Sequence, residues 1–325
     1  MLDMLGSGGM KKNEKSILKY LKENRDVYLS GNYISTKLGI SRSAVWKNIL
    51  KLRQKGYEIS ARPNRGYRLD KEPDQLDINM LKDKNIHYFQ EVDSTNLVAR
   101  QLAENNFSGY STIIAEKQLQ GRGRLGRNWF SPPNRGLWFS LLLRPKMISP
   151  AGAAPITLVT AAILAKNLRE KYKIPVTVKW PNDLLIEGKK FGGILSELKG
   201  EADRIEYLVI GIGLNINQEQ NDFPIELRSR ATSLFIESGQ YFDRTTLFLS
   251  LYSDLMPAYE YFFIKGFAPF RDQLLQHNSF IGQEVNVLWP GGSIKGFACD
   301  LNADGALIIK DNKGNTQVIN YGEIR

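Results

Sequence analysis

Three glycines and three arginines fall within seven consecutive positions, Gly121 to Arg127. Glycine adopts positive φ easily and lets backbone N–H groups approach a ligand closely, and each guanidinium offers a fixed fork of donors that suits phosphate or carboxylate oxygens. The pattern therefore predicts a loop built around an anion. A solvated loop that contacts DNA or nothing at all is the alternative, and composition alone leaves it open.

The spacing of Gly121, Gly123 and Gly126 also matches the glycine patterns of dinucleotide-binding folds and kinases. A dinucleotide-binding turn must open a helix, and Pro132 and Pro133 would break it. A kinase would need His-Arg-Asp and Asp-Phe-Gly motifs later in the chain, and neither occurs. Both classes are therefore excluded.

Charged residues interrupt apolar segments in a second region, where Lys179-Trp-Pro-Asn-Asp183 is followed seven residues later by Lys190. Lys and Asp are seldom fully buried without partners, so charges within apolar strands indicate a lined pocket. For Lys190 a solvated hairpin turn remains the alternative, and Lys189 is expected to be such a residue.

A third candidate is the run Asp93-Ser94-Thr95-Asn96, which precedes an amphipathic helical pattern from Leu97. Asp93 or Ser94 can serve as the N-cap of that helix, which would explain one of these side chains. Three consecutive hydroxyl and amide side chains at a helix start also make a site for a polar ligand. The residues alone leave both interpretations open.

Hydrophobic periodicity predicts the elements that must position these residues. Strands are expected at 111–116, 137–143, 176–180, 184–186, 191–198 and 205–216, and a strongly apolar helix at 153–171. The chain should therefore form an α/β sheet with much antiparallel pairing, in which the loop at 121–133 joins two strands.

The N-terminal region has the pattern of a winged helix-turn-helix. A helix with an apolar stripe at 17–21 precedes a short helix at 30–38 and a third helix that begins at Ser41, and a hairpin with a basic tip follows at 57–69. The expected DNA contacts are Arg42, Ser43, Trp46, Lys47, Arg62 and Arg65. A winged helix that mediates only protein contacts is the alternative.

Composition sets further bounds on the function. The formal charge of +10 and the pI of about 9.4 favour a polyanionic partner, either nucleic acid or nucleotide phosphates. With Cys299 as the only cysteine and two histidines, an intramolecular disulfide is impossible and a protein metal site is not expected. Cys299 itself is expected to be a small buried residue. No membrane-length apolar run is recognised, so a cytoplasmic protein without a membrane partner is expected. Residues 1–9 are set aside as a flexible leader, as residues that are not native to the protein, or as the product of a start codon placed too early.

Taken together, the motifs resemble those of biotin protein ligases of the bifunctional type that also repress biotin genes. The matching motifs, in the family's order, are Asp93-Ser-Thr-Asn, Gln118 with Gly121-Arg-Gly-Arg-x-Gly-Arg, Trp129, Lys179-Trp-Pro-Asn-Asp, Lys190-Phe-Gly-Gly-Ile-Leu, Gly211-Ile-Gly-Leu-Asn and Arg230-Ala-Thr-Ser-Leu. Each motif is short, but their order and spacing are specific together. The resemblance covers the chain after the leader.

The resemblance implies three domains: a winged helix-turn-helix at 10–70, a mixed, mostly antiparallel α/β ligase domain of the biotin/lipoate ligase type at 78–275, and an SH3-like β-barrel at 278–325. It implies a two-step reaction in which biotin and ATP form biotinyl-5′-AMP, and a carrier lysine then accepts the biotinyl group. Mg²⁺ is expected as an ion bound to the ATP phosphates. The implied partners are the biotin carboxyl carrier domains of biotin-dependent carboxylases, operator DNA, and a second copy of the chain when biotinyl-AMP is bound.

Carried over to this sequence, the family's roles place Ser94, Thr95, Asn96, Gln118 and Arg122 around the biotin head, with Gly121 and Gly123 in the loop that closes over it. Trp129 would cover the nucleotide, Arg124 and Arg127 would face phosphate, Asn215 would read adenine, and Arg230 would lie on the nucleotide side. Lys190 would bridge the biotin carboxylate and the α-phosphate, and Asp183 would orient or deprotonate the acceptor lysine. Lys190, Arg122, Arg124 and Asp183 form the expected catalytic set.

Two other functions share part of this pattern. A ligand-responsive repressor would bind biotin or its adenylate without catalysis, and it would need neither Lys190 nor the phosphate-directed arginines. A lipoate ligase shares the catalytic fold, but this glycine-arginine loop together with a winged helix is not expected of it.

Overall fold

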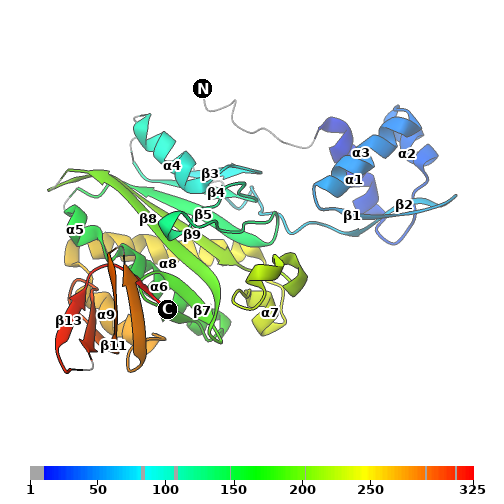
Figure 1. Ribbon diagram of the computed structural model, residues 1–325. Coiled ribbons are helices and arrows are strands. Elements are labelled where there is room, and N and C mark those ends of the chain that lie inside the picture. Colours follow the sequence, from blue (N-terminus) through cyan, green and yellow to red (C-terminus); the bar gives the residue numbers. More distant parts are fainter. Residues whose placement is uncertain are drawn as a thin grey trace. The chain divides into compact units, whose positions relative to one another are not determined.

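The computed structural model describes residues 11–81, 85–105, 109–146, 148–201, 203–289, 291–311 and 313–325. The chain divides into two compact units, one that ends at Gln75 and one that runs from Leu76 to Arg325. Figure 1 labels the helices and strands of both units.

The first unit is a winged helix-turn-helix, as the sequence predicts. Its elements are α1 (Lys12–Glu23), α2 (Gly31–Leu38), α3 (Arg42–Gln54), β1 (Glu58–Arg62) and β2 (Gly66–Lys71). The side chains of Ser30 and Ser41 cap α2 and α3 by accepting backbone N–H groups, and Gly39 ends α2 in the left-handed conformation with φ of 63°. The wing is the antiparallel hairpin of β1 and β2.

Apolar side chains from all three helices and the wing form the core of this unit. A buried ion pair lies at its edge, where Glu14 accepts Nζ of Lys55 at 2.6 Å and the backbone N–H of Lys11 at 3.2 Å. Burial raises the pKa of Glu14, but the hydrogen bonds from Lys55 and Lys11 outweigh it and hold this pKa below its ordinary value of 4.5. The pair joins the start of α1 to the end of α3.

The second unit is built on a seven-stranded sheet in the order β3-β4-β5-β9-β8-β7-β6. The strands are β3 (Ile86–Phe89), β4 (Ser111–Ala115), β5 (Gly136–Leu143), β6 (Thr177–Lys179), β7 (Asp183–Ile186), β8 (Lys189–Gly200) and β9 (Ile205–Asn215). Only β3 and β4 pair in parallel, and every other neighbouring pair is antiparallel. The mixed, mostly antiparallel sheet of the sequence analysis is confirmed.

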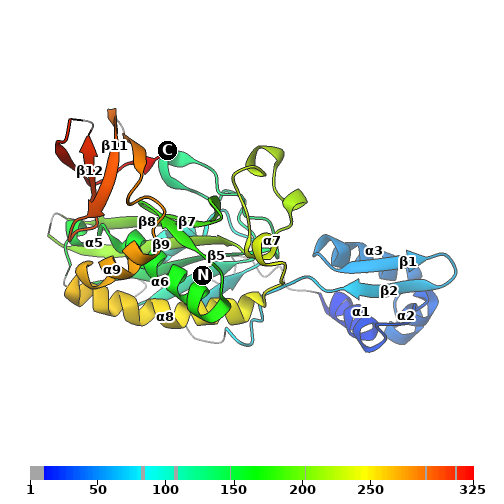
Figure 2. The ribbon, with the colours of Figure 1, turned by 90° about the horizontal axis from the view of Figure 1, so that it is seen from below.

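Helices cover both faces of this sheet (Figures 1 and 2). The α-helices of this unit are α4 (Thr95–Glu104), α5 (Pro150–Ala153), α6 (Ile156–Tyr172), α7 (Leu234–Ser238), α8 (Arg244–Lys265) and α9 (Ala268–Gln276). Ala99 and Leu102 of α4 pack on Val209 on one face, whereas α6 and α8 enclose the larger core on the other. The sequence analysis leaves α8 unassigned.

The apolar segment 150–172 has the length and composition of a membrane span, which the sequence analysis did not recognise. About two thirds of the most apolar part of this segment is buried inside the protein, and α6 contributes Leu158, Leu164 and Leu168 to the main core. Its apolar character is therefore accounted for by packing against the sheet.

The C-terminal region forms a five-stranded antiparallel sheet in the order β13-β12-β11-β10-β14, consistent with an SH3-like barrel. Its strands are β10 (Glu284–Trp289), β11 (Gly292–Leu301), β12 (Leu307–Asp311), β13 (Thr316–Ile319) and β14 (Glu323–Ile324). Val287, Leu307 and Ile309 belong to the same buried cluster as the central sheet, so the two sheets share one core.

The three domain boundaries given above stay a prediction. The expectation for Cys299 is wrong, because alternation along β11 turns its side chain to the exposed face.

Candidate active site and DNA-binding groove

The glycine-arginine loop joins β4 to β5, as predicted. The N–H of Trp129 donates to the carbonyl of Gly121 and that of Gly123 to the carbonyl of Arg127, so the loop closes on itself. A Cβ on Gly121 would lie 2.4 Å from the carbonyl oxygen of Trp129, so this position requires glycine for close approach. Of the three loop glycines only Gly126 has positive φ, at 73°. The expected left-handed conformation therefore applies to one of them.

Two facing glycines form a floor beneath the loop, because Gly193 of β8 pairs with Gly213 of β9. The indole of Trp129 lies on this floor, and a Cβ on Gly213 would come within 2.5 Å of its Nε1. That Nε1 is buried and has no hydrogen-bond partner. A buried N–H without an acceptor costs free energy, so the Trp129 side chain suits a ligand that brings an acceptor atom to Nε1.

Lys190 and Asp183 form an ion pair beside this floor, with 2.6 Å between Nζ and Oδ1. Both side chains are partly exposed, and the ammonium lies 5.2 Å from the centre of the Trp129 ring. The lined-pocket interpretation of Lys190 stays a prediction. Its backbone N–H donates to the carbonyl of Arg230, whose own side chain is exposed, so Arg230 contributes to this site through its main chain.

Buried polar side chains gather at the start of α4, and Ser94, Thr95 and Asn96 together with Gln118 are called the polar pocket below. Ser94 occupies the N-cap position, but its side chain makes no capping hydrogen bond, so capping does not explain it. Gln118 Oε1 accepts the backbone N–H of Thr95 at 2.9 Å and lies 3.1 Å from its Oγ1, and Gln118 Nε2 donates to Ser131 Oγ at 2.9 Å. The structure thus brings Thr95 and Gln118 together.

Asn96 extends this polar pocket with two partners that the sequence analysis did not predict. Its Nδ2 donates to Oε2 of Glu197 at 2.7 Å, and its Oδ1 lies 2.6 Å from Oγ of Ser140. Ser140 and Glu197 come from β5 and β8, so only the pairing of the sheet brings them to α4. A Cβ on Gly211 would collide with the Asn96 amide, which explains the glycine at that position.

Two loop arginines contact the C-terminal sheet. Arg127 forms two hydrogen bonds of 2.7 Å with the carboxylate of Glu323, which raise the pKa of Arg127 and lower that of Glu323. Arg124 donates to the carbonyl of Gly322 at 2.9 Å, and burial lowers its pKa. Arg122 is exposed. Carboxylate and carbonyl oxygens are therefore the present partners of the side chains expected to face phosphate.

Asn215 ends β9 and is almost fully buried. Its Nδ2 donates to the carbonyl of Thr232 at 2.9 Å, and its Oδ1 accepts Nε2 of Gln218 at 3.1 Å. One amide hydrogen and one acceptor lone pair of Asn215 remain for a ligand. Direct reading of adenine stays a prediction, and the structural role of this amide is to hold the segment after β9.

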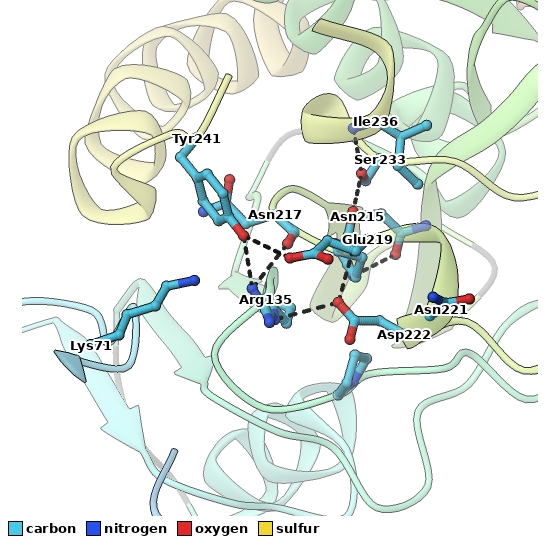
Figure 3. Close-up of polar contacts among 12 residues, drawn as sticks. Lys71, Arg135, Asn215, Asn217, Glu219, Asn221, Asp222, Ser233, Ile236 and Tyr241 are labelled. Carbon is cyan, nitrogen blue, oxygen red and sulfur yellow. Dashed lines mark hydrogen bonds and ion pairs between the residues drawn. The ribbon is translucent and has the colours of Figure 1, made fainter. Parts of the chain in front are cut away.

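That segment is fastened by a polar cluster around Arg135, which the sequence analysis missed (Figure 3). The guanidinium lies 3.4 Å from Asp222 Oδ2 and donates to the hydroxyl of Tyr241, which in turn donates to Glu219. Because Arg135 directly precedes β5, the cluster ties the segment to the strand that leaves the glycine-arginine loop. Its members lie up to about a hundred residues apart, so no local signal reveals it.

A cleft of about 180 Å³ opens just before β7 begins, between the loop and the C-terminal sheet. Arg124, Asn182, Ser196 and Tyr321 are among the residues that line it. Within the described ranges of the chain, no group of three or more His, Cys, Asp or Glu side chains is placed to hold a metal ion.

The winged helix has a groove of its own, of about 670 Å³, between α2, α3 and the wing. Arg42, Ser43, Trp46 and Arg62 line it, and Trp46 is about half exposed. Lys47 and Arg65 are exposed but are not among the lining residues. A basic groove beside the second helix of a helix-turn-helix suits a DNA duplex.

Three family models match successive regions of the chain. Residues 13–68 match an HTH domain, residues 87–215 the biotin/lipoate A/B protein ligase family, and residues 280–325 the biotin protein ligase C-terminal domain. The solved biotin protein ligase from Aquifex aeolicus in complex with biotin and ATP is 34% identical, with a TM-score of 0.65, over 75% of this chain and 98% of that one.

Curated relatives match across both units. The bifunctional ligase/repressor BirA of Bacillus subtilis is 35% identical over 92% of this chain and 94% of its own length. The protein of the same name from Escherichia coli is 33% identical over 87% of this chain and 88% of its own. With the winged helix, the ligase fold and the C-terminal sheet all present, the chain belongs to the family of bifunctional biotin protein ligases and repressors.

Proposed function

We propose that this protein joins biotin to a lysine of a carrier protein in two steps, through biotinyl-5′-AMP, and that the same site around Lys190 serves both steps. The observation that carries the proposal is the position of Lys190 beside the glycine floor, where its ammonium lies 5.2 Å from the centre of the Trp129 ring and 2.6 Å from Asp183. The Lys190 ammonium is thus available where the biotin carboxylate and the α-phosphate must meet. The protein's task in such a reaction is to position them and to stabilise developing charge.

The polar pocket at the start of α4 is assigned to the biotin head. Biotin carries a ureido group with two N–H donors and one carbonyl acceptor, and Thr95, Asn96 and Gln118 offer both acceptors and donors. Ser94 borders the pocket with a hydroxyl that its helix does not use. Their mutual hydrogen bonds hold Thr95 and Gln118 in place before the ligand arrives, which favours binding.

The phosphate end is assigned to Lys190, Arg124 and Arg127. In the first step Lys190 holds the biotin carboxylate against the α-phosphate, the carboxylate oxygen attacks phosphorus, and pyrophosphate leaves. Glu323 accepts two hydrogen bonds from Arg127 much as a phosphate would. ATP phosphates can replace that carboxylate, and Mg²⁺ accompanies them as a phosphate-bound ion. Trp129 covers the nucleotide.

Asp183 is assigned to the second step. Its Oδ1 is occupied by Lys190 in the ligand-free protein. When Lys190 turns to the adenylate, Asp183 becomes free to accept a hydrogen bond from the acceptor amine and to orient it. The amine then attacks the biotinyl carbonyl, AMP leaves, and the excess proton passes to Asp183 or to water.

The test of ligase activity is a transfer assay with labelled biotin, ATP and a carrier domain, run in parallel with labelled lipoate. We expect label on the carrier lysine from biotin only. A repressor without activity would bind biotin and leave the carrier unlabelled, and a lipoate ligase would transfer the other label. The presence of Lys190 together with the phosphate-directed arginines favours the enzyme, because recognition alone does not need them.

We assign repression to the winged-helix groove, with DNA as its ligand and biotinyl-AMP as the signal. A homodimer would place two such grooves on a two-fold operator. Sedimentation with and without biotinyl-AMP tests the dimer, and equal affinity in both states would exclude ligand-driven dimerisation. The use of ATP and the single cysteine favour a cytoplasmic location.

A further inference from the structure

The hydroxyl groups between α4 and the sheet have fewer hydrogens than the oxygen–oxygen contacts that they make. Ser140 Oγ lies 2.6 Å from Asn96 Oδ1 and 2.7 Å from Thr95 Oγ1, and Thr95 Oγ1 lies 3.1 Å from Gln118 Oε1. Each of these three contacts needs one hydrogen between its two oxygens. Ser140 and Thr95 supply two, and the amide oxygens supply none.

The orientation of the Asn96 amide decides which of the three contacts lacks a hydrogen. A carboxylate only accepts hydrogen bonds, so Glu197 Oε2, at 2.7 Å, requires the Nδ2 side of Asn96 to face it. The Oδ1 side must then face Ser140, and it takes the single proton of Ser140. Thr95 has one proton left for two neighbours, and the longer contact, with Gln118, is the one that lacks a hydrogen.

We infer that Glu197 is a positioning residue for biotin, because it fixes this amide and so leaves an unfilled acceptor site between Thr95 Oγ1 and Gln118 Oε1. A ureido N–H of biotin, directed between these two oxygens, supplies the missing hydrogen. This inference rests on the proposed function, and it assigns a role to a residue that never touches the substrate.

The variant Glu197→Gln gives an unusual expectation. A glutamine amide can donate to Asn96 Oδ1, so the Asn96 amide can turn round and donate to Ser140. Ser140 then donates to Thr95, Thr95 donates to Gln118, and each of the three contacts named above has its hydrogen, at the cost of the long contact from Asn96 Nδ2 to the Leu195 carbonyl at 3.5 Å. The network is satisfied without ligand, and the biotin N–H loses its acceptor.

The experiment measures the Kd for biotin by calorimetry, the KM for biotin and for ATP, and the thermal midpoint of the full chain. For Glu197→Gln we expect the Kd and KM for biotin to rise about threefold to tenfold, the worth of one net hydrogen bond, with the KM for ATP unchanged. The thermal midpoint should not fall, because the lost contact between Glu197 and Arg100, at 3.7 Å, is partly exposed and weak.

Glu206→Gln is the matched control, since Glu206 is an exposed carboxylate on β9 that pairs with Lys199. It should keep the wild-type Kd. If Glu197→Gln binds biotin as tightly as the wild type, or if it loses both affinity and several degrees of stability, the inference is wrong. A wild-type protein that binds no biotin would refute the proposed function, and this inference with it.

Discussion

Replacement of Lys190 by methionine separates the proposed catalytic role of its charge from its structural role. Methionine keeps much of the apolar stem and removes the ammonium. Among the residues that the structure describes, this ammonium has one polar side-chain partner, Asp183 at 2.6 Å, and about a third of the Lys190 side chain and a fifth of the Asp183 side chain are exposed. Such a pair contributes about 0–1 kcal/mol to stability. The thermal midpoint should therefore fall by no more than about 4 °C.

The effect on the first step should be much larger. Removal of one preorganised group that stabilises transition-state charge typically costs about 10²- to 10³-fold in rate. The free Asp183 carboxylate would also repel the incoming phosphates. We therefore expect pyrophosphate release from biotin and ATP to fall by at least about 10²-fold in Lys190→Met, in a protein that is still folded.

A pyrophosphate-release assay checks this expectation, and Lys189→Met is the matched control because Lys189 is exposed on the same strand. Transfer from added biotinyl-AMP should fall less, because the adenylate is already formed. If pyrophosphate release by Lys190→Met stays within about threefold of the wild type, Lys190 does not bridge the two substrates and the reasoning from its position is wrong.

Three further predictions concern other parts of the molecule. In Gly213→Ala the new Cβ, 2.5 Å from Nε1 of Trp129, should displace the indole, so that tryptophan fluorescence changes and biotin activation falls; an unchanged spectrum and rate would remove Trp129 from the floor. The lowered pKa of Glu14 means that its contribution to the winged helix is present above pH 4.5 and is lost as the pH falls through the folded-state value. Chemical unfolding should show Glu14→Gln less stable than the wild type at pH 7, with the difference shrinking below pH 4.5, and a constant difference would contradict this. In Arg42→Ala, DNA affinity should fall and the salt slope should drop by about one unit; filter binding at several salt concentrations checks this, and an unchanged slope would exclude a phosphate contact.

Local signals account for the parts of the fold that the sequence predicts correctly. Ser30 and Ser41 as caps, and Gly39 as a helix end, each act within a few residues, so the helix-turn-helix can be recognised without its surroundings. The strands that flank the glycine-arginine loop have continuous apolar runs. A continuous apolar run of about four to eight residues between turn residues indicates a fully buried strand.

The partners of the site residues depend on pairing across the sheet, and the sequence could not give them. Ser140 and Glu197 lie 44 and 101 residues from Asn96, and no motif names them. The contact of Arg127 with Glu323 spans 196 residues. The motifs name candidate site residues, whereas their hydrogen-bond partners required the register of the strands.

The central claim is that the site around Lys190 forms biotinyl-5′-AMP and passes the biotinyl group to a lysine without a covalent enzyme intermediate. A single-turnover experiment tests it most directly. The protein is mixed with labelled biotin and ATP, freed of excess ligand, and quenched with denaturant either before or after a carrier domain is added. We predict that the label before addition is released as biotinyl-5′-AMP, and that after addition it is bound to the carrier. Label that stays on the denatured enzyme, or that never reaches the carrier, would contradict the account.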